Sequence, residues 1–271
     1  MIIKIKANEA EKFSKLINLN SYFTNPYWLS YNGFYEIVNG ERVFYERDVL
    51  YRNDFPFIKL PRNKNNWINA IITNITKKEM ESIKKYLEIK SAFVFGSEYY
   101  YKTRDFIEMK GKKFKSFRKA VNQFKKRYKF RIKKTYSGRK LIEFLKKWES
   151  QQKEKNELFV VNKNFELFCI KNCKNIKGNW LFVEVDGKLA GYCLYYKANR
   201  NLWIGIQRKV DYKYNGLSRF MMHEQARIMK NVPVFTSGSA ARDKGIKEFK
   251  ESLNPYMSED RYYIITGNKK R

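Results

Sequence analysis

The sequence predicts a mixed α/β protein in which one order of elements occurs twice. Two dipeptides, Asn39-Gly40 and Asp186-Gly187, each lie between runs of alternating apolar residues, and this is the strongest short-range signal for a β-hairpin. After each hairpin, the spacing of the apolar residues predicts a further strand, an amphipathic helix and another strand. We therefore expect two structural repeats, each a twisted mixed sheet flanked by helices.

The first repeat is predicted to begin with a short strand and a helix ahead of its hairpin. Asn8 is the expected N-cap of that helix, and Pro61 ends the strand after the hairpin. Its predicted elements are a strand at 1–6, a helix at 9–17, the hairpin at 33–49, a strand at 54–60, helices at 65–72 and 77–87, and a strand at 91–96.

The second repeat follows the same order, with additional elements at its end. Its predicted elements are a strand at 128–136, helices at 141–155 and 164–173, the hairpin at 180–198, a strand at 200–210, a helix at 216–230, a strand at 233–238, a helix at 244–252 and a strand at 260–266.

A strongly basic segment, residues 110–134, lies between the repeats and contains no acidic residue. Phe114, Phe117, Val121 and Phe124 recur at helical spacing, so one stripe of a helix can pack on the core while basic side chains face outward. An ordinary solvated helix face is the alternative, but without acids there is no Glu–Lys pairing along the helix, which favours an anion-binding face for a phosphate backbone or an anionic membrane surface. Its thirteen basic residues are Lys110, Lys112, Lys113, Lys115, Arg118, Lys119, Lys125, Lys126, Arg127, Lys129, Arg131, Lys133 and Lys134.

The composition excludes several classes of protein. The 271 residues include 57 Lys and Arg against 27 Asp and Glu, a net charge of +30, and 17% are aromatic, which excludes disorder as the main description. Such a charge repels itself unless an anionic partner or salt neutralises it. No apolar run is long enough to cross a bilayer, and the first residues lack the apolar core of a signal peptide, so we expect a soluble, cytoplasmic protein.

The cysteines and the single histidine argue against metal sites and catalytic triads. Cys169, Cys173 and Cys193 form an odd set without close pairing, so neither a disulfide framework nor a zinc site is indicated. One buried helix face explains Cys169 and Cys173, and His223 lies in a helical pattern as a structural residue. We expect no metal and no permanently bound cofactor.

The passage from the strand at 200–210 to the next helix contains the sequence KYNGLS. A glycine at such a passage lets a phosphate or a polarised carbonyl approach the helix amides, although an ordinary helix start is the alternative. The sequence resembles the acyl-CoA pyrophosphate loop of the GNAT superfamily, Arg/Gln-x-x-Gly-x-Gly/Ala, with Lys213 and Ser218 departing at its two ends. The candidate donor-binding residues are Ile206, Gln207, Lys213, Asn215, Gly216, Leu217, Ser218 and Arg219.

Two longer stretches resemble the C-terminal catalytic domain of phosphatidylglycerol lysyltransferases and their stand-alone relatives. The first has a Tyr-rich strand before a basic helix, with Gly111, Lys112, Lys113, Arg118 and Asn122 at the motif positions. The second matches at Asp243, Gly245, Phe249, Lys250, Asn254 and Pro255, whereas Ile246 and Lys247 replace Leu and Arg.

This resemblance implies a tandem GNAT fold and a transferase that takes an aminoacyl group from aminoacyl-tRNA. It implies a degenerate GNAT-like domain at 1–109, a basic connecting helix at 110–127 and a GNAT domain with the active site at 128–271. The residues expected to contact nucleic acid are Lys112, Lys113, Lys115, Arg118, Lys119, Lys125, Lys126 and Arg127.

Acyl transfer needs a polarised carbonyl, a neutral nucleophile and a proton for the leaving group. Asp243 and Lys250 are candidates for orientation and proton transfer, although Asp243 is also a suitable N-cap for the helix that follows it. Glu184 is a candidate general base or an outward-facing strand residue.

Three functions remain open at this point. The first is an aminoacyl-tRNA-dependent transferase, which the charge favours. The second is an acetyl-CoA- or acyl-CoA-dependent transferase that acts on a small amine or on nucleic acid. The third is a non-catalytic nucleic-acid-binding protein with a degenerate GNAT fold, which the retention of Gly216, Asp243 and Lys250 disfavours.

Overall fold

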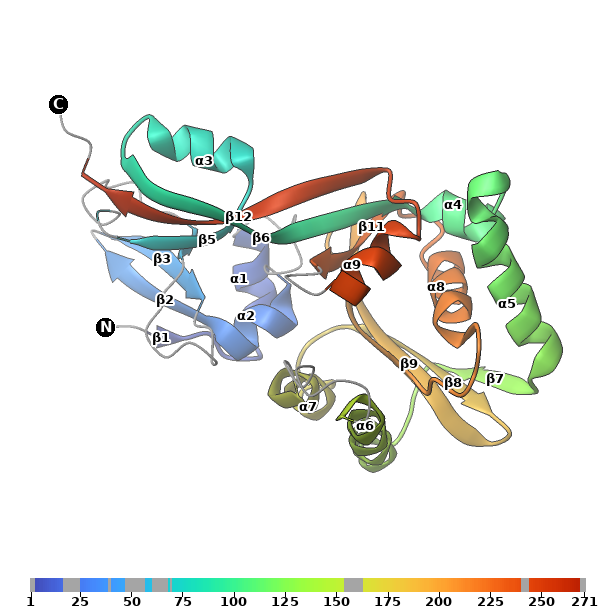
Figure 1. The fold of residues 1–271 in the computed structure, drawn as a ribbon. Coiled ribbons are helices and arrows are strands. Elements are labelled where there is room, and N and C mark those ends of the chain that lie inside the picture. Colours follow the sequence, from blue (N-terminus) through green and yellow to red (C-terminus); the bar gives the residue numbers. More distant parts are fainter. Residues whose placement is uncertain are drawn as a thin grey trace. The chain divides into compact units, whose positions relative to one another are not determined.

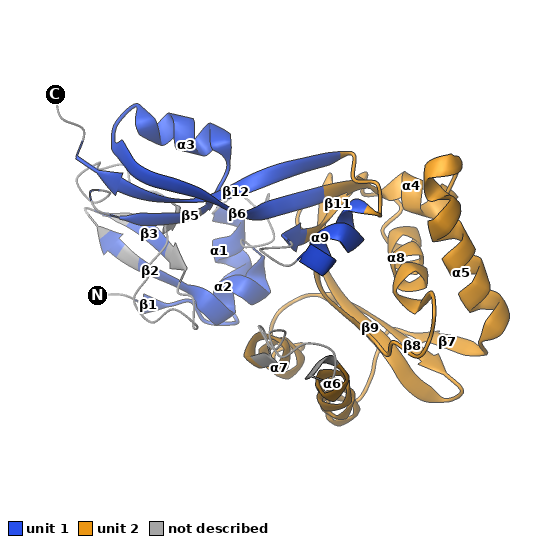
Figure 2. Ribbon diagram, in the orientation of Figure 1, with its two compact units in different colours: residues 1–99, 238–251, 257–271 blue, residues 100–237, 252–256 orange. Residues whose placement is uncertain are grey.

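The computed structural model describes residues 3–16, 25–38, 40–46, 57–59, 68, 70–153, 163–239 and 244–268. The chain divides into two compact units (Figure 2): residues 1–99, 238–251 and 257–271 form the first, and residues 100–237 and 252–256 form the second. The chain thus enters the second unit and later returns to the first. The domain boundaries predicted from the sequence, after residues 109 and 127, follow the repeated order of elements, whereas these two units are defined by spatial contacts. The predicted boundaries therefore stay a prediction.

The first unit begins with a four-stranded antiparallel sheet in the order β1-β2-β3-β4. The predicted hairpin at residues 33–49 is confirmed in its described part, because Val38 pairs with Glu41 and Gly40 has a φ of 77°. Helices α1 and α2 contribute to a core that includes Phe13, Leu29 and Phe44. The elements are β1 (Ile3–Lys4), α1 (Ala10–Leu16), α2 (Pro26–Asn32), β2 (Gly33–Val38), β3 (Glu41–Glu46) and β4 (Phe57–Lys59).

Helix α2 lies in an aromatic segment that no periodicity predicts. Its start is explained by its cap, because Asn25 Oδ1 accepts a hydrogen bond of 3.0 Å from the Trp28 N–H. Pro26 occupies the first helical position, where its missing N–H costs nothing.

The first unit also contains strands in the order β5-β12-β6. Helix α3 begins at a capping box between Thr76 and Glu79 and packs Met80 and Ile83 against Ile72 of β5. The elements are β5 (Ile71–Ile75), α3 (Lys77–Lys84), β6 (Glu88–Lys102), α9 (Lys244–Glu251) and β12 (Met257–Gly267).

The helix predicted over residues 65–72 is wrong at each position that the structure describes: Ile68 lies in a turn, Ala70 in no regular element, and the last two residues in β5. Ile71 and Ile72 are β-branched, and a β-branched residue fits a pleated strand better than a helix. Pairing of β5 with β12, nearly two hundred residues later in the chain, decides the outcome: Ile72 pairs with Ile264. Local spacing contains no information on that partner.

The second unit contains a mixed sheet in the order β11-β10-β9-β8-β7. Neighbouring strands from β7 to β10 are antiparallel, and β10 and β11 are parallel. The predicted hairpin at Asp186-Gly187 is confirmed, with φ angles of 50° and 75° at these two residues. The strands are β7 (Phe130–Lys133), β8 (Asn179–Val185), β9 (Lys188–Lys197), β10 (Leu202–Val210) and β11 (Val234–Ser239).

Helices cover both faces of this sheet (Figure 1). On one face, α8 packs so closely that a Cβ on Gly191 of β9 would lie 2.9 Å from Met221 Sδ, and α4 and α5 pack against α8. On the other face, α6 and α7 share a core with Phe182 and Tyr192. The helices are α4 (Thr103–Glu108), α5 (Lys115–Arg127), α6 (Gly138–Lys153), α7 (Lys163–Lys171) and α8 (Leu217–Ile228), and a 3₁₀ turn, Lys112–Phe114, precedes α5.

Candidate active site

Strand β10 is the central element of the candidate site. It pairs with β9 along its length, whereas its pairing with β11 has three registered pairs and ends at Ile204 and Thr236. A bulge follows at once, with Ile206 as the extra residue between Gly205 and Gln207. Bulges commonly redirect side chains next to active sites.

Gln207, directly after the bulge, is a buried polar side chain without a partner. It is 8% exposed, and neither its Oε1 nor its Nε2 has a hydrogen-bond partner among the residues that the structure describes. Its register with Leu194 places it on the face covered by α6 and α7. Because burying an amide without hydrogen-bond partners costs free energy of folding, this side chain is a candidate for binding a polar ligand. Donor binding by Gln207 stays a prediction, and its buried, unpartnered amide is consistent with that role.

Gly216 precedes helix α8 in the left-handed conformation, with a φ of 86°. A Cβ at this position would lie 2.4 Å from the Ala120 carbonyl oxygen of α5 and 3.3 Å from Phe124 Cβ. The glycine is therefore required by the packing of α8 on α5. The sequence suggests that the missing Cβ makes room for an approaching donor, but in the structure atoms of α5 occupy that space.

The start of α8 retains features of an anion-binding site. The Leu217 N–H donates to the Tyr214 carbonyl at 3.1 Å, which leaves Ser218 and Arg219 as the next amides of the first turn. Arg219 also has a buried Nε without a partner. Lys213 and Asn215 are exposed in the preceding loop, where the Lys213 N–H donates to Asp211 Oδ1 at 3.1 Å.

The predicted basic helix is confirmed as α5 and its preceding turn, with Phe114, Phe117, Val121 and Phe124 buried. Lys115, Lys119 and Lys126 recur at intervals of four and seven residues on the opposite side, and Lys112 of the turn continues the same stripe. These four lysines, the α5 lysine face, are exposed and have no acidic partner among the described residues.

Other basic residues of this segment are already engaged. Arg118 donates from Nη1 to the Met109 carbonyl, where α4 ends, so its guanidinium stabilises a turn. Lys125 Nζ lies 3.6 Å from Glu224, and Lys113 Nζ lies 4.0 Å from Asp105. Arg127 is exposed beside the Tyr128 ring.

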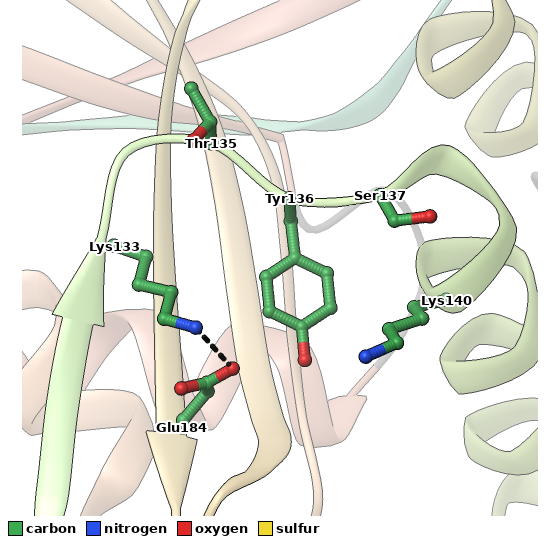
Figure 3. Close-up of a pocket in the computed structure, with 6 residues that line it drawn as sticks. All are labelled: Lys133, Thr135, Tyr136, Ser137, Lys140 and Glu184. Atoms are coloured by element: carbon green, nitrogen blue, oxygen red, sulfur yellow. Dashed lines mark hydrogen bonds and ion pairs between the residues drawn. The ribbon is translucent and has the colours of Figure 1, made fainter.

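Glu184 lies in a pocket of about 360 Å³ at the edge of the sheet, shown in Figure 3. Its carboxylate is 2.9 Å from Lys133 Nζ. The hydrogen bond from Lys133, together with Tyr136, holds the pKa of Glu184 below its ordinary value. A lowered pKa makes a carboxylate a weaker base, so the structure favours a structural ion pair over the predicted general base. The pocket is lined by Lys133, Thr135, Tyr136, Ser137, Lys140 and Glu184.

Lys250 is buried in the first unit and is held by backbone oxygens. Its Nζ donates to the Gly238 carbonyl at 2.6 Å and to the Ser239 carbonyl at 3.0 Å. These bonds give Lys250 a role at the end of β11, and catalysis by this residue stays a prediction. Asp243, its predicted partner, lies outside the described residues.

His223 is the only histidine, and it is buried in α8. Its Nδ1 is 2.8 Å from the Phe106 carbonyl, so Nδ1–H donates. Burial lowers the pKa of His223 below its ordinary value, which keeps the ring neutral near pH 7. The side chain joins α8 to α4 as a structural residue.

Neither metal-binding clusters nor membrane-spanning helices are present in the described part of the chain. No group of three or more His, Cys, Asp or Glu side chains there is arranged to bind a metal. No helix of the same residues combines the length and the apolar character that crossing a bilayer requires.

A set of polar residues lies under α6 and α7, on the same face as Gln207, and was not predicted from the sequence. Lys209 and Tyr192 are opposite one another on β10 and β9, and Glu166 of α7 forms an ion pair with Lys209. The sequence offered only a weak signal, because Gln207, Arg208 and Lys209 are consecutive polar residues and such a run does not show which of them face α6 and α7.

Comparison with known proteins identifies the family. Residues 62–264 match the family described as phosphatidylglycerol lysyltransferase, C-terminal. The chain belongs to this family. The resemblance expected from the sequence is therefore confirmed, and the chain has the acyl-type transferase fold of this family. No curated protein matches the chain by sequence comparison.

Solved structures support the lysyltransferase-type fold at low sequence identity. A conserved protein of unknown function from Bacteroides thetaiotaomicron has a TM-score of 0.80 at 14% identity, covering 97% of this chain and 98% of that one. L-PGS from Bacillus licheniformis has a TM-score of 0.65 at 13% identity, with 99% and 94% covered. FemX has a TM-score of 0.60 at 11% identity, with 98% and 97% covered.

Proposed function

We propose that this protein transfers an aminoacyl group from aminoacyl-tRNA to an amine or hydroxyl acceptor. The family is named for a lysyltransferase that acts on phosphatidylglycerol, which supports aminoacyl transfer as the reaction class. The choice of tRNA as the donor rests on the α5 lysine face, which lies in the same compact unit as the bulged strand β10.

The α5 lysine face fits a polynucleotide better than a coenzyme. From Lys115 to Lys126 the helix rises by about 16 Å, so its cations can contact several successive phosphates. A coenzyme needs only a local site, for which the start of α8 suffices. None of these four lysines has an acidic partner in the part of the chain that the structure describes, which leaves their charge available to an external anion.

Gln207 supplies a donor for the reacting carbonyl. In the transfer, the acceptor nitrogen or oxygen forms a bond to the ester carbon, the bond to the ribose oxygen breaks, and the proton of the acceptor passes to that oxygen. Negative charge builds on the carbonyl oxygen in between, and a buried N–H donor such as Gln207 Nε2 stabilises it. The chemistry requires neither a metal nor a covalent intermediate.

The function is tested by the fate of a labelled amino acid. The protein is incubated with a panel of tRNAs charged with radiolabelled amino acids, and separately with labelled acetyl-CoA, each with fractions of cell extract as acceptors. We expect label to leave at least one charged tRNA and to enter an acceptor. Transfer from acetyl-CoA with no response to any charged tRNA would instead establish a coenzyme-dependent acyltransferase.

Two buried glutamines provide matched variants for this assay. Gln207 and Gln225 each have an unpartnered Nε2, but Gln225 lies on α8. We expect Gln207→Leu to lower the transfer rate by about 10²- to 10³-fold, the usual loss for one carbonyl-polarising donor. Gln225→Leu should retain the rate. Equal activity of the two variants would exclude Gln207 from the chemistry.

A further inference from the structure

A layer of polar side chains lies on the sheet of the second unit, on the face covered by α6 and α7. The register of β8, β9 and β10 places Trp180, Leu194 and Gln207 in one row across the strands. The next row consists of Phe182, Tyr192 and Lys209. Side chains opposite one another in such rows are about 4.5–5.5 Å apart at Cβ, which applies to Lys209 and Tyr192. Gln207 lies diagonally across from Tyr192, at about 7–8 Å, which is still within reach of long side chains.

The two helices add carboxylates and a further indole ring to this layer. Glu166 of α7 forms an ion pair with Lys209, whose Nζ also lies 3.9 Å from the centre of the Trp148 ring of α6. Glu149 of α6 is buried and close enough for its charge to act on Glu166 and on Tyr192. The layer is therefore built from five elements, three strands and two helices.

Several buried polar atoms of this layer have no hydrogen-bond partner within the described ranges of the chain. Tyr192 is fully buried, with 0% of its surface exposed, and its hydroxyl is unpartnered. Gln207 lacks partners for both side-chain amide atoms, and the indole N–H groups of Trp148 and Trp180 are also buried without partners. A layer that served packing alone would be apolar at these positions, so the groups point to a polar ligand.

The charges of the layer favour a cation. Among the side chains that the structure describes, two carboxylates, Glu149 and Glu166, are near one ammonium group, that of Lys209. Burial and the charge of Glu149 raise the pKa of Glu166, although Lys209 acts in the opposite direction. The layer would thus be stabilised by a further positive charge.

We propose that this layer binds a primary ammonium group, with the Glu166 carboxylate and the Tyr192 hydroxyl as its partners. The third N–H of the ammonium is directed to Gln207 Oε1, which leaves Gln207 Nε2 for a carbonyl. This inference rests on the proposed function for its role: the ammonium belongs either to the transferred aminoacyl group or to an amine acceptor.

Binding of small amines to the full-length protein tests the inference without tRNA. Alaninamide represents the aminoacyl group, 1,4-diaminobutane represents an amine acceptor, and N-acetylalaninamide is the uncharged control. We expect saturable binding of a charged probe by calorimetry and none of the control. Tighter binding of alaninamide assigns the site to the donor, and tighter binding of the diamine assigns it to the acceptor.

Matched variants link the binding to the layer. Tyr192→Phe and Glu166→Gln each remove one proposed partner with little change in volume, and we expect each to weaken binding by about 10-fold or more, the usual loss for a hydrogen bond to a charged group. Tyr195→Phe is the control, because Tyr195 lies on the same strand, pairs with Gly205 and contacts Trp203 on the opposite face. Its affinity should stay within about twofold of the wild type, as for a change outside the site.

Two outcomes would overturn the inference. One is the absence of saturable binding of either amine to folded protein. The other is equal affinity in Tyr192→Phe, Glu166→Gln and Tyr195→Phe, each shown to be folded by circular dichroism. Failure of the proposed function would give a different result. If the protein binds the amine at this layer but transfers no label from charged tRNA, the ammonium site is supported and the aminoacyl reaction is excluded.

Discussion

Replacing Gly216 by alanine should destabilise the second unit through a contact between two helices. The left-handed backbone at this position costs a non-glycine residue about 1–2 kcal/mol. The new Cβ would also lie 2.4 Å from the Ala120 carbonyl oxygen, well inside van der Waals contact. Because this neighbour is backbone, α5 or α8 must shift, and overpacking of this kind costs about 1–3 kcal/mol. The two costs together predict a loss of about 2–5 kcal/mol in the free energy of unfolding.

The matched control for this prediction is Gly187→Ala. Gly187 is also left-handed, with a φ of 75°, but nothing lies within 4 Å of its added Cβ. This variant therefore has the backbone cost alone, and the difference between the two variants isolates the contact with α5. Urea unfolding, followed by tryptophan fluorescence, gives both free energies from the midpoint and the slope. If Gly216→Ala is no less stable than Gly187→Ala, the packing of α8 on α5 is not as described.

Three further predictions concern charge, a buried lysine and pH. Changing Lys112, Lys115, Lys119 and Lys126 to Gln should reduce the salt dependence of tRNA affinity by up to about 3 in the log–log slope. The same change at four lysines of the first unit, Lys77, Lys78 and Lys84 of α3 and Lys85 directly after it, should leave the slope nearly unchanged. Lys250→Met should destabilise the protein by about 2–3 kcal/mol in urea unfolding, because two carbonyls lose a charged donor, while exposed Lys247→Met should have little effect. Burial and the nearby charges of Lys125 and Arg227 lower the pKa of His223 below its ordinary value of 6.5, although its hydrogen bond to Phe106 and the charge of Glu224 act in the opposite direction. Because the unfolded chain then binds the proton more tightly, thermal stability should fall as the pH drops below 6.5. This fall should be smaller in His223→Gln.

Local signals were sufficient for much of the fold. Asp186-Gly187 has the left-handed angles that its hairpin requires, and the apolar spacing of Phe117, Val121 and Phe124 places α5 correctly. Ile71 and Ile72 show the limit of such signals, because their partner strand, β12, lies far away in the sequence. Strand pairing over that distance overrides a weak helical pattern.

The candidate site was only partly predictable for the same reason. Gln207 was identified from its place on the strand before the glycine loop. That its buried side-chain amide lacks hydrogen-bond partners could not be predicted, because this depends on how the rest of the unit packs around it. Tyr192 and Glu166 have no sequence signal, since they meet Lys209 only through strand register and helix packing. Arg118 was assigned to nucleic acid from charge alone, whereas its guanidinium is bound to the end of α4.

We propose above that the chemistry at β10 uses an aminoacyl ester delivered by tRNA. The most direct measurement is the single-turnover loss of that ester from charged tRNA, with protein in excess and acceptor present. We expect rapid loss of the ester with the wild type and a rate about 10²-fold or more lower with Gln207→Leu. When protein is limiting, the rate of loss should fall steeply as the salt concentration rises. An ester that is equally stable with and without the protein, for every amino acid and acceptor fraction tested, would contradict the claim.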